Sequence, residues 1–392
     1  MTQARRVALL MTHPTQYHAP WFRALAQRPE MSIHVYYGFQ PSPDLQGKDF
    51  GVRFEWDAPL LDGYPNSFLE NIAEPGWGYR SLDTPGIRDI IAREPFDCWV
   101  INGWSTKSEW QAIRACWKRR LPMMIRGDST LLDRRPLPTR IAKRLLLGRW
   151  LPRFERYLTV GKLNEDYYEH YGADRSRFFP VRHFVDNDWF ARKAGEARAD
   201  RARLRKSMGI PADATVFLFA GKLMHKKQPA AAVEAMKHLR RDSGAHLLVV
   251  GDGAMRGQCE SIATAAGLPV TFAGFFNQSR MPEAYAAADV LLLPSAYDET
   301  WGLVVNEAMA SGLPAIVSDK VGCAPDLIAT GETGAVFPAG NVPELAMQME
   351  KYLSTRSEAS RQGQNAALRI QRYSLDQAVE NTVNAVLSVN DI

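Results

Sequence analysis

Short apolar runs alternate with longer segments of helical spacing along this chain. The apolar runs predict buried strands, because they are too short for helices, and they lie at 7–11, 33–37, 98–101, 123–125, 157–160, 178–181, 215–220, 246–250, 271–276, 290–293 and 315–317. Segments whose apolar residues recur every three or four positions predict helices, and they include 21–27, 109–119, 191–207, 229–239, 281–287, 302–311, 344–353 and 375–387. Alternation of this kind is typical of an α/β fold with parallel sheets.

The strand and helix signals form two series, which predicts two doubly wound, Rossmann-like domains facing across a cleft. We expect a first domain over residues 1–195, on the acceptor side of the cleft, and a nucleotide-binding second domain over 196–374. The charged segment 191–207 is the expected connector. Residues 375–392 form a closing helix that could pack back on the first domain.

The amino-acid composition is that of an ordinary globular protein. Of 392 residues, 46% are hydrophobic and 23% are charged, which argues against disorder. No window holds the roughly 18 apolar residues that span a bilayer, and the apolar run after Arg5 and Arg6 is too short for a signal peptide. The cysteines, which have no metal-ligand spacing, are Cys98, Cys116, Cys259 and Cys323. We therefore expect a cytoplasmic protein with reduced thiols.

The net charge of +5 is concentrated in one segment, 134–156. Only Glu155 opposes its basic residues, which are Arg134, Arg135, Arg140, Lys143, Arg144, Arg149, Arg153 and Arg156. Leucine, tryptophan and phenylalanine residues are interleaved, as in a basic amphipathic helix that contacts an anionic membrane. The protein would then be peripheral at the inner face of the membrane. A domain helix whose basic side faces water is the alternative, and we expect no nucleic-acid partner.

The stretch from Pro294 to Pro314 frames a helix start with two carboxylates, Glu299 before it and Glu307 inside it. Backbone N–H groups of Gly302 and Leu303 would lie at the positive end of the helix dipole, which favours an anion. The arrangement suits a nucleotide sugar, with its diphosphate on the N–H groups and its hydroxyl groups on the two carboxylates. Two solvated acids around an ordinary helix would give the same spacing.

Two glycine turns follow strands of the second domain. The turn Gly221–Lys227 carries ammonium groups that suit a diphosphate, at Lys222 and Lys227. The turn at Gly251-Asp252-Gly253 nearly copies a dinucleotide fingerprint, but it has one residue too many before its last glycine. No acidic residue follows where the ribose would need one, so a nicotinamide site and an oxidoreductase are disfavoured.

In the first domain, polar loops follow three strands and should open at one sheet edge. The first loop holds His13, Gln16, Tyr17 and His18. We assign them to acceptor binding, with plain loop packing as the alternative, rather than to a metal, because no carboxylate or thiol partners lie nearby. A later loop holds Arg126 and Asp128. The irregular stretch 40–78 carries aromatic residues that line an acceptor pocket or pack on their own domain.

The string Glu-Thr-Trp-Gly-Leu-Val-Val-Asn-Glu-Ala-Met-Ala-Ser-Gly-Leu-Pro-Ala-Ile-Val-Ser, residues 299–318, resembles the signature of retaining glycosyltransferases of family 4, which have the GT-B fold. Gly-Lys-Leu-x-x-x-Lys at 221–227 is similar to the diphosphate clamp of that family, and Asp186-Asn187-Asp188 resembles its interdomain stretch rather than a metal motif. The resemblance is dense over 220–337 and looser before.

The resemblance implies a transferase that moves a sugar from a nucleotide diphosphate to an acceptor hydroxyl without a metal cofactor. It implies that Glu299 orients the sugar, that Glu307 holds the ribose, and that the donor also contacts Lys222, Lys227, Gly251, Phe275, Trp301, Gly302 and Leu303. Where the family often has a histidine, this chain has Arg126-Gly127-Asp128, so Arg126 and Asp128 are candidate catalytic substitutes.

The acceptor is not implied: a lipid-linked glycan, a small molecule and a protein stay open. A 2-epimerase or hydrolase with the same fold and a non-catalytic nucleotide-sugar-binding subunit are the alternative functions.

Overall fold

The computed structural model describes residues 4–132 and 136–389, and these residues fall into two compact units. The first unit contains the chain up to Leu45, then Pro59–His183, then the chain from Leu375 onward. The second contains Gln46–Ala58 and Phe184–Ser374. The chain therefore leaves the first unit twice, for the short segment 46–58 and for the long segment 184–374, and returns to it both times.

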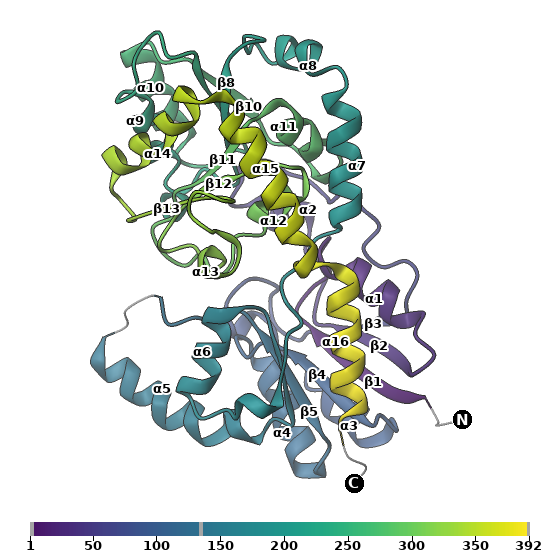
Figure 1. Cartoon of the computed structure of the whole chain (residues 1–392). Coiled ribbons are helices and arrows are strands. Elements are labelled where there is room, and N and C mark those ends of the chain that lie inside the picture. Colours follow the sequence, from purple (N-terminus) through teal and green to yellow (C-terminus); the bar gives the residue numbers. More distant parts are fainter. Residues whose placement is uncertain (1–3, 133–135, 390–392) are drawn as a thin grey trace. The chain divides into compact units, whose positions relative to one another are not determined.

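The first unit is built on a parallel sheet, which has seven strands among the residues described (Figure 1). Its spatial order is β3-β2-β1-β4-β5-β6-β7, and the strands are β1 (Arg5–Met11), β2 (Met31–Tyr37), β3 (Asn66–Phe68), β4 (Cys98–Asn102), β5 (Met123–Gly127), β6 (Arg156–Thr159) and β7 (Phe178–Phe179). The helices of this part of the chain are α1 (His18–Ala26), α2 (Pro43–Gly47), α3 (Ile87–Arg93), α4 (Lys107–Arg119), α5 (Leu137–Trp150), α6 (Lys162–His170) and α16 (Leu375–Leu387).

Helix α16 completes one face of the first sheet. It contacts α1, β1, β6 and β7, and Figure 1 shows it in yellow beside the purple α1 and β1. Arg28 pairs with Glu380, and Asn381 donates to the carbonyl oxygen of Pro180 at 3.0 Å. Helix α16 thus packs on the unit that contains β1.

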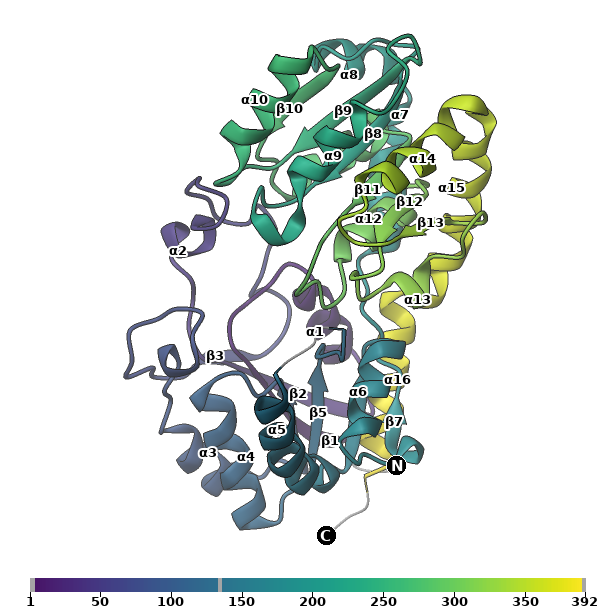
Figure 2. The same ribbon diagram turned by 90° about the vertical axis from the view of Figure 1, so that its left-hand side faces the viewer.

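The second unit has a six-stranded parallel sheet, counted over the described residues, in the order β10-β9-β8-β11-β12-β13 (Figure 2). The strands are β8 (Thr215–Ala220), β9 (Ala245–Val250), β10 (Val270–Gly274), β11 (Val290–Leu293), β12 (Ala315–Ser318) and β13 (Gly334–Phe337). The helices are α7 (Asn187–Arg198), α8 (Arg201–Ser207), α9 (Pro229–Met236), α10 (Arg256–Ala266), α11 (Met281–Ala287), α12 (Leu303–Ala310), α13 (Ala324–Leu327), α14 (Val342–Ser354) and α15 (Arg356–Ile370). Every residue of β8, β9, β11 and β12 is buried, as expected for parallel strands covered on both faces.

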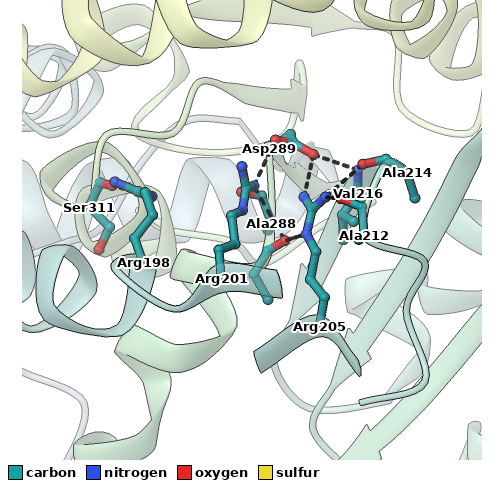
Figure 3. A network of polar contacts seen from close by, with 10 residues as sticks. Arg198, Arg201, Arg205, Ala212, Ala214, Val216, Ala288, Asp289 and Ser311 are labelled. Atoms are coloured by element: carbon teal, nitrogen blue, oxygen red, sulfur yellow. Dashed lines mark hydrogen bonds and ion pairs between the residues drawn. The ribbon is translucent and has the colours of Figure 1, made fainter. Parts of the chain in front are cut away.

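An arginine network fastens α8 to this sheet and α7 to the end of α12, where Arg198 donates to the carbonyl oxygen of Ser311 at 2.8 Å (Figure 3). Arg205 and Arg201 both reach the carboxylate of Asp289, at 2.8 and 2.7 Å, and that carboxylate also accepts from the backbone N–H of Val216 at 2.8 Å. The guanidinium of Arg205 further donates to the carbonyl oxygens of Ala287, Ala212 and Ala214. Because its side chain is only 4% exposed, this buried charge depends on that full set of partners.

Three stretches differ from the sequence prediction. The stretch 40–78 is not wholly irregular, since it contains α2 and β3. The single helix expected at 191–207 is two helices, α7 and α8, and Asp186 caps the first of them by accepting from the N–H of Trp189. Helix α15 was not predicted, because its sequence is polar; Gly363 lets it approach closely, since a Cβ there would lie 2.1 Å from the carbonyl oxygen of Gly312.

Candidate functional site

The order in which successive strands are added to the second sheet reverses at β8, whose neighbours are β9 on one side and β11 on the other. In open α/β sheets, ligands bind beyond the carboxyl ends of the strands at such a switch point. The loops that begin there are Gly221–Lys227 after β8 and Ser295–Gly302 after β11. The two stretches that the sequence assigned to the donor therefore start at adjacent strands.

The glycine turns of this sheet pack against one another at backbone distance. A Cβ on Gly251 would lie 2.0 Å from the carbonyl oxygen of Gly221, and one on Gly253 would lie 2.8 Å from that of Leu223. Both glycines also have positive φ angles, of 131° and 147°. Position 251 therefore requires a glycine so that the turn can pack against Gly221, whether or not the turn binds a ligand.

The loop before α12 is held by a second close approach. A Cβ on Gly322 would lie 1.8 Å from the carbonyl oxygen of Thr300, and the N–H of Gly322 donates to the carbonyl oxygen of Glu299 at 2.9 Å. Gly302 then caps α12 with a φ of 96°. Leu303, the first helical residue, is partly exposed, so the helix N-terminus that the sequence predicted is present at this loop.

Lys227 and Glu299 form an ion pair across these two loops. Their side chains are 17% and 9% exposed, and Ser295 donates from Oγ to the same carboxylate oxygen at 2.8 Å. A carboxylate with two donors at a nearly buried position is held in one orientation. One of the two predicted phosphate-binding lysines thus contacts the carboxylate that the sequence assigned to the sugar.

Glu307 lies one helical turn into α12 and is buried. It accepts a hydrogen bond at Oε2 from the hydroxyl group of Tyr285 on α11, at 2.5 Å. Trp301 is also buried, and its indole N–H donates to Oδ1 of Asn306 at 2.8 Å. The side chain of Trp301 therefore contributes to the packing of the loop.

Segment 46–58 belongs to the second unit although it comes from the first half of the chain. Phe50 and Phe54 pack on Phe275, with ring centroids 5.0 and 4.4 Å away. Asp49 forms an ion pair with Lys222 at 2.7 Å. Phe50 and Phe54 thus do not pack on the first unit, whereas Tyr64 and Trp77 of the same irregular stretch do, against Phe22 and His13.

In the first unit, the structure brings Arg126 and His18 together. Arg126, on β5, donates from Nη1 to Nε2 of His18 at 3.3 Å and lies over the ring of Trp21, 5.4 Å from its centroid. Arg126 is 3% exposed, and burial lowers its pKa to about 10. Burial lowers the pKa of His18 well below its usual value, so its imidazole is neutral and can accept from the guanidinium.

The other predicted acceptor residues lie in the same loop after β1. His13 packs edge-on against Trp77, 4.9 Å between ring centroids, and burial lowers its pKa to about 4. Gln16 is buried, and Tyr17 precedes the first residue of α1. Asp128 follows β5 and is exposed. These residues line one edge of the first sheet, next to the loops that follow β4 and β5.

Other sequence motifs have structural explanations. Asp186 caps α7, and Asn187 donates to the carbonyl oxygen of Ile370 at 3.1 Å. All four cysteines are buried free thiols. Over residues 4–132 and 136–389, no cluster of three or more His, Cys, Asp or Glu side chains has the geometry to hold a metal ion.

Three contributors were missed by sequence reasoning. They are Ser295, Tyr285 and the segment around Asp49. Ser295 lies only four residues before Glu299, but the two residues are in a loop, where this spacing does not indicate a contact. Tyr285 and Asp49 are far from their partners in sequence, and no local pattern reveals such pairs.

Residues 200–369 match the family "Glycosyl transferases group 1". An uncharacterized glycosyltransferase of Methanocaldococcus jannaschii is 31% identical over 188 residues, which cover 47% of this chain and 48% of that protein. A D-inositol 3-phosphate glycosyltransferase of Streptomyces bingchenggensis is 31% identical over 227 residues, 55% of this chain and 48% of that protein. Each match thus spans about half the length of the curated relative.

Solved structures resemble the whole chain in fold. Anabaena HepE in complex with UDP aligns with a TM-score of 0.74 and 17% identity, over 98% of this chain and 100% of that one. A glycosyltransferase from Rickettsia africae aligns with a TM-score of 0.75 and 13% identity, over 99% and 100%. The two doubly wound sheets, the switch-point loops and these matches agree: the chain has the GT-B fold, and residues 200–369 of its second unit are similar to the group 1 glycosyltransferases.

Proposed function

We propose that this protein is a retaining glycosyltransferase that moves a sugar from a nucleotide diphosphate to an acceptor hydroxyl. The observation that carries the proposal is the Lys227–Glu299 pair beside the N-terminus of α12, at the switch point of the second sheet. It places a cation, a carboxylate and helix N–H groups around one region. A diphosphate next to a sugar is the ligand that uses all three.

In the proposed reaction, the bond between the anomeric carbon and the diphosphate oxygen breaks, and the diphosphate leaves with the electron pair. The acceptor oxygen forms the new bond on the same face, and its proton passes to an oxygen of the leaving phosphate. Lys222, Lys227 and the N–H groups at Gly302 and Leu303 stabilise the charge that develops on the diphosphate. Glu299 favours positive charge near the anomeric carbon, and Glu307 holds the ribose.

We also propose that transfer needs no metal ion, because protein cations neutralise the diphosphate. The test is transfer in excess chelator, which should leave the rate unchanged. Loss of activity that Mn²⁺ or Mg²⁺ restores would overturn this part of the proposal.

The test of the function begins with calorimetric titration of UDP, GDP and dTDP. The HepE structures with UDP and with UDP-glucose make UDP the first choice. Incubation of the matching nucleotide sugar without acceptor separates transfer from the alternatives: an epimerised or hydrolysed donor as main product supports a 2-epimerase or hydrolase. A screen with lipid-linked, small-molecule and protein acceptors then identifies the acceptor class, and absence of turnover with all of them supports a non-catalytic subunit.

The proposal that α5 contacts a membrane is supported by the solvent exposure of its apolar side chains. Leu137, Ile141 and Leu145 recur every four residues, and their side chains are 64%, 53% and 72% exposed. Arg140 and Arg144 are exposed beside them, whereas Arg134 and Arg135 lie outside the described residues. No described helix has the length and hydropathy to cross a bilayer. An exposed apolar row flanked by arginines is what an anionic membrane surface binds.

Vesicle co-sedimentation tests this contact. Binding to vesicles that contain anionic phospholipid should exceed binding to neutral vesicles, and it should fall in an Ile141→Gln, Leu145→Gln double variant. Leu368→Gln is the matched control, because Leu368 is a 73% exposed leucine on α15 of the other unit. Equal binding of both variants would contradict a role for α5.

A further inference from the structure

Segment 46–58 is fastened to the second unit at two places. At its far end, the N–H and hydroxyl group of Ser279 both donate to the carboxylate of Asp57, and Asn277 donates to the carbonyl oxygen of Glu55 at 2.6 Å. Figure 2 shows the purple chain that follows α2 beside the green strands of this unit. The segment is thus anchored near β10, next to the turns that follow β8 and β9.

At its near end, the segment brings the carboxylate of Asp49 to Lys222, which the sequence assigned to donor binding. The carboxylate of Asp49 lies 2.7 Å from Nζ of Lys222, and Nζ also lies 5.4 Å from the centroid of the Phe50 ring. Lys222 lowers the pKa of Asp49, and Lys48 and Lys226 contribute, so the carboxylate is charged. In this arrangement the ammonium group of Lys222 is occupied by a residue of its own chain.

The backbone of Asp49 also approaches the second glycine turn. A Cβ on Gly253 would lie 3.1 Å from the carbonyl oxygen of Asp49. Phe50 and Phe54 cover Phe275 at the same time. The segment therefore touches three features that the sequence assigned to the donor: Lys222, the Gly251–Gly253 turn and Phe275.

We propose that Asp49 is an internal competitor of the donor, which holds Lys222 until the diphosphate displaces its carboxylate. The inference rests on the proposed function, because it assumes that Lys222 binds the diphosphate. A carboxylate and a diphosphate oxygen accept the same ammonium hydrogens, and a diphosphate carries more negative charge. The side chains of Lys222 and Asp49 are 34% and 41% exposed, so water weakens their attraction and the exchange is accessible.

The competition has a defined size. Half-exposed ion pairs contribute little to stability, so removal of the carboxylate should tighten binding of the diphosphate by about two- to fivefold. The gain should shrink as salt rises, because exposed charges are screened. A residue that merely packed against the glycine turn would produce neither the tighter binding nor its dependence on salt.

The experiment is calorimetric titration of UDP, and separately of inorganic pyrophosphate, into the full chain and four variants. Asp49→Asn should lower the dissociation constant, and Lys222→Ala should raise it. In the double variant Asp49→Asn, Lys222→Ala, the constant should equal that of Lys222→Ala, because Asp49 acts through Lys222. Glu55→Gln, which removes one exposed negative charge from the same segment without contact to Lys222, should match the unchanged protein.

Two results would overturn the inference. If Asp49→Asn binds UDP with unchanged or lower affinity while Lys222→Ala weakens binding, the donor uses Lys222 but Asp49 does not compete. If Glu55→Gln tightens binding as much as Asp49→Asn, general charge and not the ion pair is responsible. If neither the unchanged chain nor any variant binds a nucleoside diphosphate, the proposed function is contradicted. The inference is then contradicted too, and this outcome differs from the first two because the unchanged chain itself does not bind.

Discussion

Lys227 and Glu299, which are 72 positions apart in sequence, share one hydrogen-bonded ion pair at the carboxyl ends of adjacent strands. In the proposed complex, the diphosphate binds the lysine and the sugar binds the carboxylate. The ion pair therefore orients the lysine and the carboxylate before the donor binds. Removal of the lysine and removal of the carboxylate should have different effects.

The lysine of this pair should control nucleotide affinity. Lys227→Ala should raise the dissociation constant of UDP about tenfold or more, since a charge-assisted hydrogen bond is lost. Calorimetry provides the measurement. Lys237→Ala is the control, because Lys237 is an exposed lysine of the same unit that pairs with Glu234. Similar losses in both variants would show a nonspecific charge effect.

The carboxylate should control the chemical step. Glu299→Gln should reduce the transfer rate at saturating donor by at least about a hundredfold, because charge stabilisation at the anomeric carbon is lost. Nucleotide affinity should stay within tenfold of the unchanged protein. Single-turnover assays separate the two quantities. A variant that transfers sugar at full rate would remove Glu299 from the mechanism.

Tyr285 should act through Glu307. Tyr285→Phe removes the hydroxyl group that donates to Glu307, so the carboxylate loses one fixed orientation and UDP binding should weaken by about threefold to tenfold. Binding of pyrophosphate, which has no ribose, should not change. Tyr352→Phe is a matched control because its hydroxyl group bonds to Gln362 instead. An equal loss of pyrophosphate binding would contradict the ribose assignment.

The arginine network should be essential for the stability of the second unit. Arg205→Met should destabilise it by about 3 kcal/mol, because Asp289 and three carbonyl oxygens lose a buried partner. Urea unfolding followed by tryptophan fluorescence measures the shift. Arg203→Met, at an 86% exposed position on the same helix, should have little effect.

Acid should destabilise the first unit through its buried histidines. Burial lowers the pKa of His13 to about 4 and puts those of His18 and His183 well below the usual 6.5. As pH falls, the histidines of the unfolded chain therefore bind protons before those of the folded chain. Their contribution to the free energy of unfolding is complete above about pH 6.5 and declines as pH falls toward 4. The melting temperature should drop over this range. His18→Gln should flatten the drop, whereas His238→Gln, at an exposed position, should leave it unchanged.

Local signals predicted much of this structure. Strands β8 and β11 and helices α11 and α16 have the bounds that the apolar pattern indicated, since each is a continuous apolar run or a clear amphipathic segment between turn residues. The helix start after Gly302 was predicted because a glycine before an apolar helical segment is a local pattern. The roles of Glu299 and Glu307 rested on the resemblance to family 4 and stay predictions.

Partners that are distant in sequence could not be predicted in this way. Asp49 meets Lys222 across 173 positions, and Tyr285 meets Glu307 from another helix. Helix α15 escaped detection because small residues such as Gly363, and not large apolar ones, set its packing. In each case the cause is tertiary contact, which leaves no periodic trace in the chain.

The position of α16 has a consequence for how the protein is made. Strand β1 emerges from the ribosome long before α16, because the helix that covers it is complete only after residue 387 has been synthesised. The second unit lies wholly between these two events, so it can acquire its fold during translation while the first remains unfinished. Until α16 has been made, a nascent chain would expose the face of β1 and α1 that this helix covers.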